Sequence, residues 1–252
     1  MAIEGPRALV AGNWKMNGGV AMLKEPRLLA AMLKDVKLKC DVMVCPPAII
    51  ARRVKSVLKG SRIRLGGQDC HWAASGAHTG EISAEMLREA GATAVIVGHS
   101  ERRTNHGETD EIVSKKASAA HRAGLKAIIC IGETLDERKA GKTLQVLSRQ
   151  IRGSIPSGSN ADFTVIAYEP VWAIGTGLTP TTAEVAEAHA HIRKELESVV
   201  GQEAAATRIL YGGSVKGSNA TELMGTPNVN GALVGGASLK AADFLGIIKV
   251  YA

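Results

Sequence analysis

The strongest constraint on the fold is a regular alternation along the chain. Eight short runs rich in Val, Ile, Ala and Leu alternate with longer segments of helical periodicity. Nearly continuous apolar runs are typical of strands buried on both faces of a parallel sheet. We expect strands at 8–13, 41–47, 63–69, 93–99, 126–132, 164–170, 208–214 and 231–237. We expect helices at 22–34, 48–58, 83–90, 108–123, 143–152, 181–200, 218–224 and 241–249.

Eight strand–helix units in 252 residues indicate an α/β fold, a closed (β/α)8 barrel of eight parallel strands with outer helices. An open doubly wound sheet fits this number of units less well. The segment 155–162 is rich in Ser, Gly and Asn, but its place before the sixth strand predicts a loop. No other segment reads as a linker, so the sequence predicts one domain over 1–252.

Cysteine usage and the lack of long apolar runs bear on where the protein works. No stretch approaches the roughly 18 consecutive apolar residues of a membrane helix, and the start does not read as a secretory signal. The four cysteines have no CxxC spacing and fall in or near expected strands: Cys40, Cys45, Cys70 and Cys130. We therefore expect neither structural disulfides nor a zinc site, no membrane partner, and a cytoplasmic location.

The net charge of +7 could suit a nucleic-acid binder. However, the basic residues are scattered and aromatic residues are only 3% of the chain, so a stacking platform for bases is not indicated. The sequence therefore predicts no nucleic-acid partner. A positive surface that attracts small anions fits better.

Polar residues follow several apolar strands, where (β/α)8 barrels place their active sites. Asn13 and Lys15 come at the end of the first strand, His99 after the fourth and Glu169 after the sixth. A lysine supplies positive charge, a histidine a hydrogen-bond donor and a glutamate a base. Together they indicate acid–base chemistry on an anionic substrate.

Glycine-rich turns after the last two strands indicate what this anion is. Gly213 and Ser214 follow the seventh strand, and Gly235 and Gly236 follow the eighth. Their main-chain N–H groups can approach a ligand closely, and barrels often bind phosphate at these two loops. Each pair of glycines alone is weak evidence because turns need glycine anyway. Together with Lys15, they favour a phosphorylated substrate.

The chain resembles the triosephosphate isomerase family over essentially its whole length. Seven stretches match the family in order: GNWKMN (12–17), TGEIS (79–83), GHSERR (98–103), CIGE (130–133), AYEPVWAIGTG (167–177), YGGSV (211–215) and GALVGGASL (231–239). The resemblance implies interconversion of dihydroxyacetone phosphate and D-glyceraldehyde 3-phosphate through an enediolate, in glycolysis and gluconeogenesis. It also implies that no metal or organic cofactor is needed.

The resemblance assigns roles to individual residues. Glu169 is implied as the base, and His99 as a neutral imidazole that donates to the substrate oxygens, a known feature of this family. Lys15 would balance negative charge, with Asn13 placing it. Glu101 lies near the lysine in the family and is a possible supporting residue.

The phosphate contacts implied by the resemblance are main-chain N–H groups of Gly175, Ser214 and Gly236. The segment AIGTG (173–177) is implied as a lid that closes over the phosphate, with Pro170 and Trp172 at its first hinge.

Two positions depart from the family pattern. The family loop that inserts into the partner subunit reads here GAHTGE, with His78 in place of an aromatic residue. Its full length implies a homodimer, and we expect protonation of His78 to weaken that dimer. Asn230 replaces a family aspartate that pairs with an arginine matching Arg193, which leaves at most a hydrogen bond.

Two other functions remain open from the sequence. The first is another (β/α)8 enzyme acting on a sugar phosphate, which would share the glycine-rich loops but not the trio Lys15, His99 and Glu169. The second is a non-catalytic basic binding protein, against which the complete set of catalytic positions argues.

Overall fold

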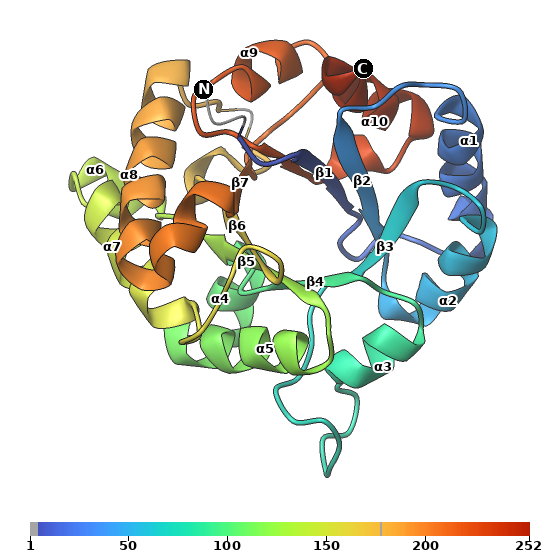
Figure 1. Cartoon of the computed structure of the whole chain (residues 1–252), viewed down its shortest axis with the longest axis horizontal. Helices are drawn as coiled ribbons and strands as arrows, with labels where there is room; N and C mark the ends of the chain where they lie inside the picture. The colour runs from blue at the N-terminus through green and yellow to red at the C-terminus, as the bar shows by residue number, and fades with distance from the viewer. Residues whose placement is uncertain (1–4, 177) are drawn as a thin grey trace.

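A computed structural model of the protein describes residues 5–176 and 178–252. Eight parallel strands form a closed barrel in chain order, and β8 pairs with β1 to complete it (Figure 1). The strands are β1 (Ala8–Asn13), β2 (Cys40–Cys45), β3 (Ile63–Gly67), β4 (Ala94–Val97), β5 (Lys126–Ile131), β6 (Thr164–Tyr168), β7 (Arg208–Tyr211) and β8 (Gly231–Val234). The predicted (β/α)8 barrel is confirmed.

Helices surround the barrel as an outer ring (Figure 1). They are α1 (Lys24–Met32), α2 (Ala48–Val57), α3 (Ala84–Glu89), α4 (Ser100–His106), α5 (Asp110–Arg122), α6 (Leu135–Lys139), α7 (Thr143–Ser154), α8 (Thr182–Val200), α9 (Ala220–Met224) and α10 (Ala241–Ile248). Short 3-10 turns adjoin several of them, including η2 (Val171–Ala173). Within the described ranges, no helix has the length and apolar character to span a bilayer.

The core has two layers because successive strand residues point to opposite faces of the sheet. One set of alternate residues packs inside the barrel, for example Leu9 and Ala11 on β1 and Val165 and Ala167 on β6. The other set, such as Val10, packs outward against the helices. The barrel interior is therefore filled with side chains, and only the residues beyond the strand ends are open to a ligand.

The strand predictions were wrong at their carboxyl ends and two helices were missed. Seven of the eight strands end one to three residues earlier than predicted. The residues beyond these ends include prolines, which cannot donate to a strand ladder, and the polar residues of the candidate site. The helices α4 and α6 lie in short segments whose apolar periodicity is too brief to detect.

The segment 69–83 projects beyond the ring of helices between β3 and α3 (Figure 1). His78 lies on it, and its ring is tilted against that of His71 with 3.9 Å between ring centroids. The single domain predicted over 1–252 stays a prediction, since residues 1–4 and 177 lie outside the described ranges.

Candidate active site

Strand alternation delivers two of the predicted residues to the open end of the barrel. Continuing the inward-facing series by two residues leads from Ala11 to Asn13 on β1 and from Ala167 to Glu169 after β6. Both side chains are buried. The Glu169 carboxylate thus follows the apolar strand β6 because the inward position after Ala167 lies at the floor of the site.

Glu169 is only 2% exposed, yet its carboxylate is well supplied with donors. Oε2 accepts a hydrogen bond from the amide of Ser100 at 2.9 Å, and Oε1 lies 2.9 Å from Nε2 of His99. Burial alone raises the pKa of Glu169, but the His99 pairing, the Ser100 amide and Lys15 together lower it below its usual value. The resting carboxylate is therefore ionised at neutral pH.

Two glycines leave room for this carboxylate. A Cβ on Gly132 would lie 1.7 Å from the main-chain oxygen of Glu169, and one on Gly212 would lie 2.8 Å from its Cγ. Real Cβ atoms do not approach other atoms this closely, so any larger residue would displace Glu169. The strand ends on both sides of β6 are thus shaped around the carboxylate.

His99 precedes α4 and its ring nitrogens have different partners. The amide of Glu101 donates to Nδ1 at 3.2 Å, so the proton of the neutral ring is on Nε2, which points at Glu169. Burial lowers the pKa of His99, but the charge of Glu169 and the hydrogen bond to it raise the pKa overall. The resemblance implies a neutral ring; in the unliganded site the neighbouring carboxylate favours the protonated form.

Lys15 has a backbone φ of 51°, a left-handed conformation that is uncommon outside glycine. The Oδ1 of Asn13 accepts from the Lys15 amide at 3.0 Å, and Nε2 of Gln68 donates to the Lys15 carbonyl at 2.9 Å. These two contacts hold the strained residue. Its Nζ lies 2.6 Å from Oε1 of Glu101, which balances the ammonium in the unliganded site.

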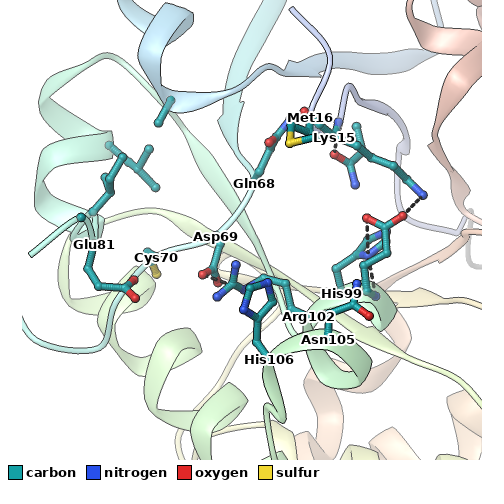
Figure 2. Close-up of a pocket in the computed structure, with 16 residues that line it drawn as sticks. Lys15, Met16, Gln68, Asp69, Cys70, Glu81, His99, Arg102, Asn105 and His106 are labelled. Atoms are coloured by element: carbon teal, nitrogen blue, oxygen red, sulfur yellow. Dashed lines mark hydrogen bonds and ion pairs between the residues drawn. The ribbon is translucent and has the colours of Figure 1, made fainter. Parts of the chain in front are cut away.

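One cavity of about 320 Å³ collects nearly all of the predicted site residues. Its lining includes Asn13, Lys15, His99, Glu169, Gly175, Ser214, Gly235 and Gly236. Glu101 lines a neighbouring cavity of about 510 Å³, in which Figure 2 shows Lys15 and His99 on one side and Asp69, Arg102 and His106 on another. The first cavity therefore combines an ionised base, a hydrogen-bond donor, a cation and exposed main-chain amides.

Comparison with known proteins decides the family. The family model described as triosephosphate isomerase matches residues 8–251. The chain belongs to the triosephosphate isomerase family.

Individual relatives agree with this assignment. The triosephosphate isomerase of Mesorhizobium japonicum is 60% identical over 248 residues, which are 98% of this chain and 97% of that protein. That of Rhizobium meliloti is 57% identical, covering 97% of this chain and 96% of the relative. A crystal structure of triosephosphate isomerase from Bartonella henselae is 53% identical, with a TM-score of 0.91 and coverage of 97% and 99% of the two chains.

Membership of the triosephosphate isomerase family makes the protein an aldose–ketose isomerase. It interconverts dihydroxyacetone phosphate and D-glyceraldehyde 3-phosphate, a step of glycolysis and gluconeogenesis. The open cavity with its cation and exposed amides agrees in chemistry with a small phosphorylated substrate. The other sugar-phosphate enzyme and the non-catalytic binding protein are thereby set aside.

Two residues of the predicted lid, Ile174 and Gly175, line the cavity. Gly175 is exposed, and nothing lies within 4 Å of the position of a Cβ built on it. At the start of the lid, the Oγ of Ser214 donates to the carbonyl of Ala173 at 2.8 Å. The lid was predicted over 173–177, and Gly177 lies outside the described residues.

Three residues of the site escaped the sequence reasoning. They are Ser100, which donates to Glu169; Gln68, which holds Lys15; and Glu133, which accepts from Nε1 of Trp172 at 2.8 Å. Gln68 is 53 residues from Lys15 in sequence and Glu133 is 39 residues from Trp172, so no local spacing reveals these contacts. Ser100 could have been found from its place directly after His99 at a helix start.

The substitution at Asn230 has the predicted consequence for contacts. Nη2 of Arg193 donates to Oδ1 of Asn230 at 2.8 Å, and the same oxygen accepts from the amide of Ile209 at 3.0 Å. The hydrogen bond to Arg193 therefore remains where the family pattern has an ion pair.

Proposed function

We propose that Glu169 is the base that carries a proton between the two adjacent carbons of the triose phosphate, through an enediolate. The observation that carries this proposal is the near-complete burial of an ionised carboxylate in the cavity that also contains His99 and Lys15. Burial removes competing water and by itself raises the pKa of Glu169, so the carboxylate becomes a stronger base once substrate displaces its contacts with His99 and Ser100. The contacts of Glu169 with Ser100 and His99 hold it aside until substrate enters.

His99 and Lys15 stabilise the charge that develops on the substrate oxygens. The Nε2–H of His99, which faces Glu169 in the unliganded site, donates to the carbonyl oxygen of bound substrate, while the Lys15 ammonium leaves Glu101 for the substrate. Asn13 keeps Lys15 in its left-handed conformation. Glu101 acts as a supporting residue that forms an ion pair with Lys15 in the free enzyme.

The phosphate is bound by main-chain amides of Gly175, Ser214, Gly235 and Gly236. These residues line the cavity on the side of β7 and β8, where the turns expose backbone N–H groups. Closure of the lid brings Gly175 to the phosphate and excludes water from the enediolate. No step of this chemistry requires a metal or an organic cofactor.

Glu169→Asp tests the assignment of the base. Shortening the side chain withdraws the carboxylate by about 1 Å, which we expect to lower kcat about 10²-fold with little change in KM. The measurement is a coupled assay of D-glyceraldehyde 3-phosphate formation from dihydroxyacetone phosphate. Glu111→Asp, at an exposed residue of α5, is the control for the loss of a methylene. Equal kcat values for wild type and Glu169→Asp refute the role of Glu169.

We also propose that the protein acts as a homodimer in which the projecting segment 69–83 of each copy enters the larger cavity of the other. Two exposed apolar side chains support this proposal: Met16, which lines that cavity at 97% exposure, and Ile49, which follows the lining residue Ala48 and is 89% exposed. Two large apolar side chains exposed beside one cavity agree with a surface that a partner covers.

His78 gives the dimer a predicted pH dependence. Its ring lies against that of His71, and a positive charge on His78 in the buried interface would oppose association. Sedimentation velocity at micromolar protein is expected to show more monomer at pH 5.5 than at pH 8. Equal dissociation constants at the two values refute the role of His78, and a monomer at both refutes the dimer.

A cytoplasmic location is part of the same proposal. The four cysteines are free and buried, which agrees with a reducing compartment. Fractionation of cells that express the full chain tests it, and recovery in a secreted or membrane fraction contradicts it.

A further inference from the structure

The two ends of the lid are fastened to different parts of the barrel. At the first end, Trp172 lies on η2, where its Nε1 donates to the buried carboxylate of Glu133. At the second end, α8 begins with a capping box in which Thr181 and Glu184 exchange hydrogen bonds. Motion of the lid must therefore strain or break contacts at one or both of these ends.

Arg138 of α6 reaches both anchors at once. Its guanidinium carbon lies 4.2 Å from the centroid of the Trp172 ring, a cation–π arrangement. Its Nη2 donates to Oε1 of Glu184, and its Nη1 lies 3.8 Å from Oε1 of Glu133. One partly buried side chain thus connects the first hinge of the lid to the helix that follows the lid.

The surroundings of Arg138 make its position well defined. Burial raises the pKa of Glu184, but the hydrogen bonds from Thr181 and then the charge of Arg138 lower it overall, so that the carboxylate is ionised at neutral pH. On the other side, the carbonyl of Glu133 accepts from the amide of Val171 at 3.1 Å, which ties the hinge to the end of β5. A guanidinium held by a carboxylate at its edge keeps its flat face on the indole.

The two contacts of Arg138 respond differently to lid motion. Glu184 belongs to the first turn of a 19-residue helix packed on the barrel, so its ion pair does not depend on the lid. Trp172 lies on η2 within the hinge itself, so rotation of the hinge moves its ring relative to α6. A contact changes an equilibrium between two states only when it differs between them, and the stacking of Arg138 on Trp172 meets that condition.

We propose that Arg138, oriented by Glu184, is a positioning residue that braces the first hinge in the open position and thereby opposes lid closure. The proposal rests on the proposed function in one respect, that the segment after Trp172 closes over the phosphate. The structure is the braced state, with Gly175 exposed and Arg138 stacked on Trp172.

The brace predicts that removing Arg138 tightens binding of ligands that close the lid. In Arg138→Met the stem of similar length remains but the charge is lost, so closure no longer has to break the cation–π contact. We expect Kd for glycerol 3-phosphate and KM for dihydroxyacetone phosphate to fall together by about two- to fivefold, the factor that corresponds to one partly exposed cation–π contact. A change that only damaged the fold would raise both constants.

Two further variants are expected to change Kd and KM by intermediate amounts. Arg138→Lys keeps a charge for Glu184 but loses the flat guanidinium, and Glu184→Gln keeps an acceptor for the Thr181 amide but releases Arg138. Both are expected to lie between wild type and Arg138→Met. Lys139→Met, at the exposed neighbouring residue of α6, is the matched control and is expected to leave both constants unchanged.

The decisive measurement combines steady-state kinetics with stopped-flow tryptophan fluorescence on mixing with glycerol 3-phosphate. Trp172→Phe identifies the part of the signal that comes from the hinge. The brace is refuted if Arg138→Met or, should that variant be unfolded by circular dichroism, Arg138→Lys leaves both constants unchanged or raises them. Wild-type protein without turnover, or without any fluorescence response to glycerol 3-phosphate, would instead contradict the proposed function.

Discussion

Two glutamates at the ends of neighbouring strands show how one barrel produces opposite environments. Glu133 follows β5 and Glu169 follows β6, and both are almost fully buried. The pKa of Glu133 is raised by burial, which the hydrogen bonds from Trp172 and Tyr168 only partly offset. The pKa of Glu169 is lowered, because the interaction with His99, the hydrogen bond from the Ser100 amide and the charge of Lys15 stabilise its ionised form.

The difference shows that burial alone does not determine what a carboxylate does. Glu169 faces the cavity inside the barrel, has glycines on both sides and contacts groups that substrate can replace. Glu133 receives side-chain hydrogen bonds from Trp172 and Tyr168, which hold it against the lid hinge. The first carboxylate lines a cavity that a ligand can enter, whereas the second is a fixed acceptor beside the hinge of the proposed lid.

Filling the space beside Glu169 is expected to give the largest effect. In Gly212→Ala the new methyl group would meet Cγ of Glu169 at 2.8 Å and the carbonyl of Tyr168 at 3.1 Å, so the carboxylate must shift. We expect kcat to fall about 10²-fold, as a displacement of about 1 Å does in a positioned site. The measurement is the coupled assay together with a thermal melt.

Gly246→Ala is the control for this change, because it adds a methyl group within α10 where the nearest atoms are 3.8 Å away. A helical glycine replaced by alanine raises stability by about 0.5–1 kcal/mol and has no route to Glu169. Unchanged kcat in Gly212→Ala would mean that Glu169 does not depend on the space beside it.

Removing the fixed acceptor is expected to act on stability before catalysis. Glu133→Ala leaves the Nε1–H of Trp172 and the hydroxyl of Tyr168 without their acceptor and opens a cavity at a fully buried position. We expect a loss of about 2–4 kcal/mol in the free energy of unfolding. Urea denaturation at a fixed protein concentration measures it.

Glu133→Gln separates the hydrogen bonds from the charge. The amide oxygen can still accept from Trp172, so the variant should retain most of the stability that Glu133→Ala loses. A loss equal to that of Glu133→Ala would show that the charge near Arg138, and not the acceptor, stabilises the hinge.

The same two residues show how far the sequence could predict the site. Glu169 was predictable because the period of two along β6 and the polar residues at the strand ends are local signals. The barrel and eight of the ten helices in the described part of the chain follow from local periodicity in the same way, while α4 and α6 are too short to show it. The role of Glu133 depends on Trp172, 39 residues away, and becomes visible only when the strands are adjacent in space.

The opposite pKa shifts predict opposite pH dependences of stability, the smallest of these effects. The pKa of Glu169 is lowered on folding, so its ionisation stabilises the fold above the ordinary carboxylate pKa, and this stability is lost as pH falls through the lowered value. The pKa of Glu133 is raised on folding, so stability is lost as pH rises from the ordinary value through the raised one. Relative to wild type, Glu169→Gln should therefore become less stable as pH rises, and Glu133→Gln more stable. Urea midpoints at one protein concentration across pH 3.5–7 measure both differences, and slopes of the same sign would contradict the contrast between the two carboxylates.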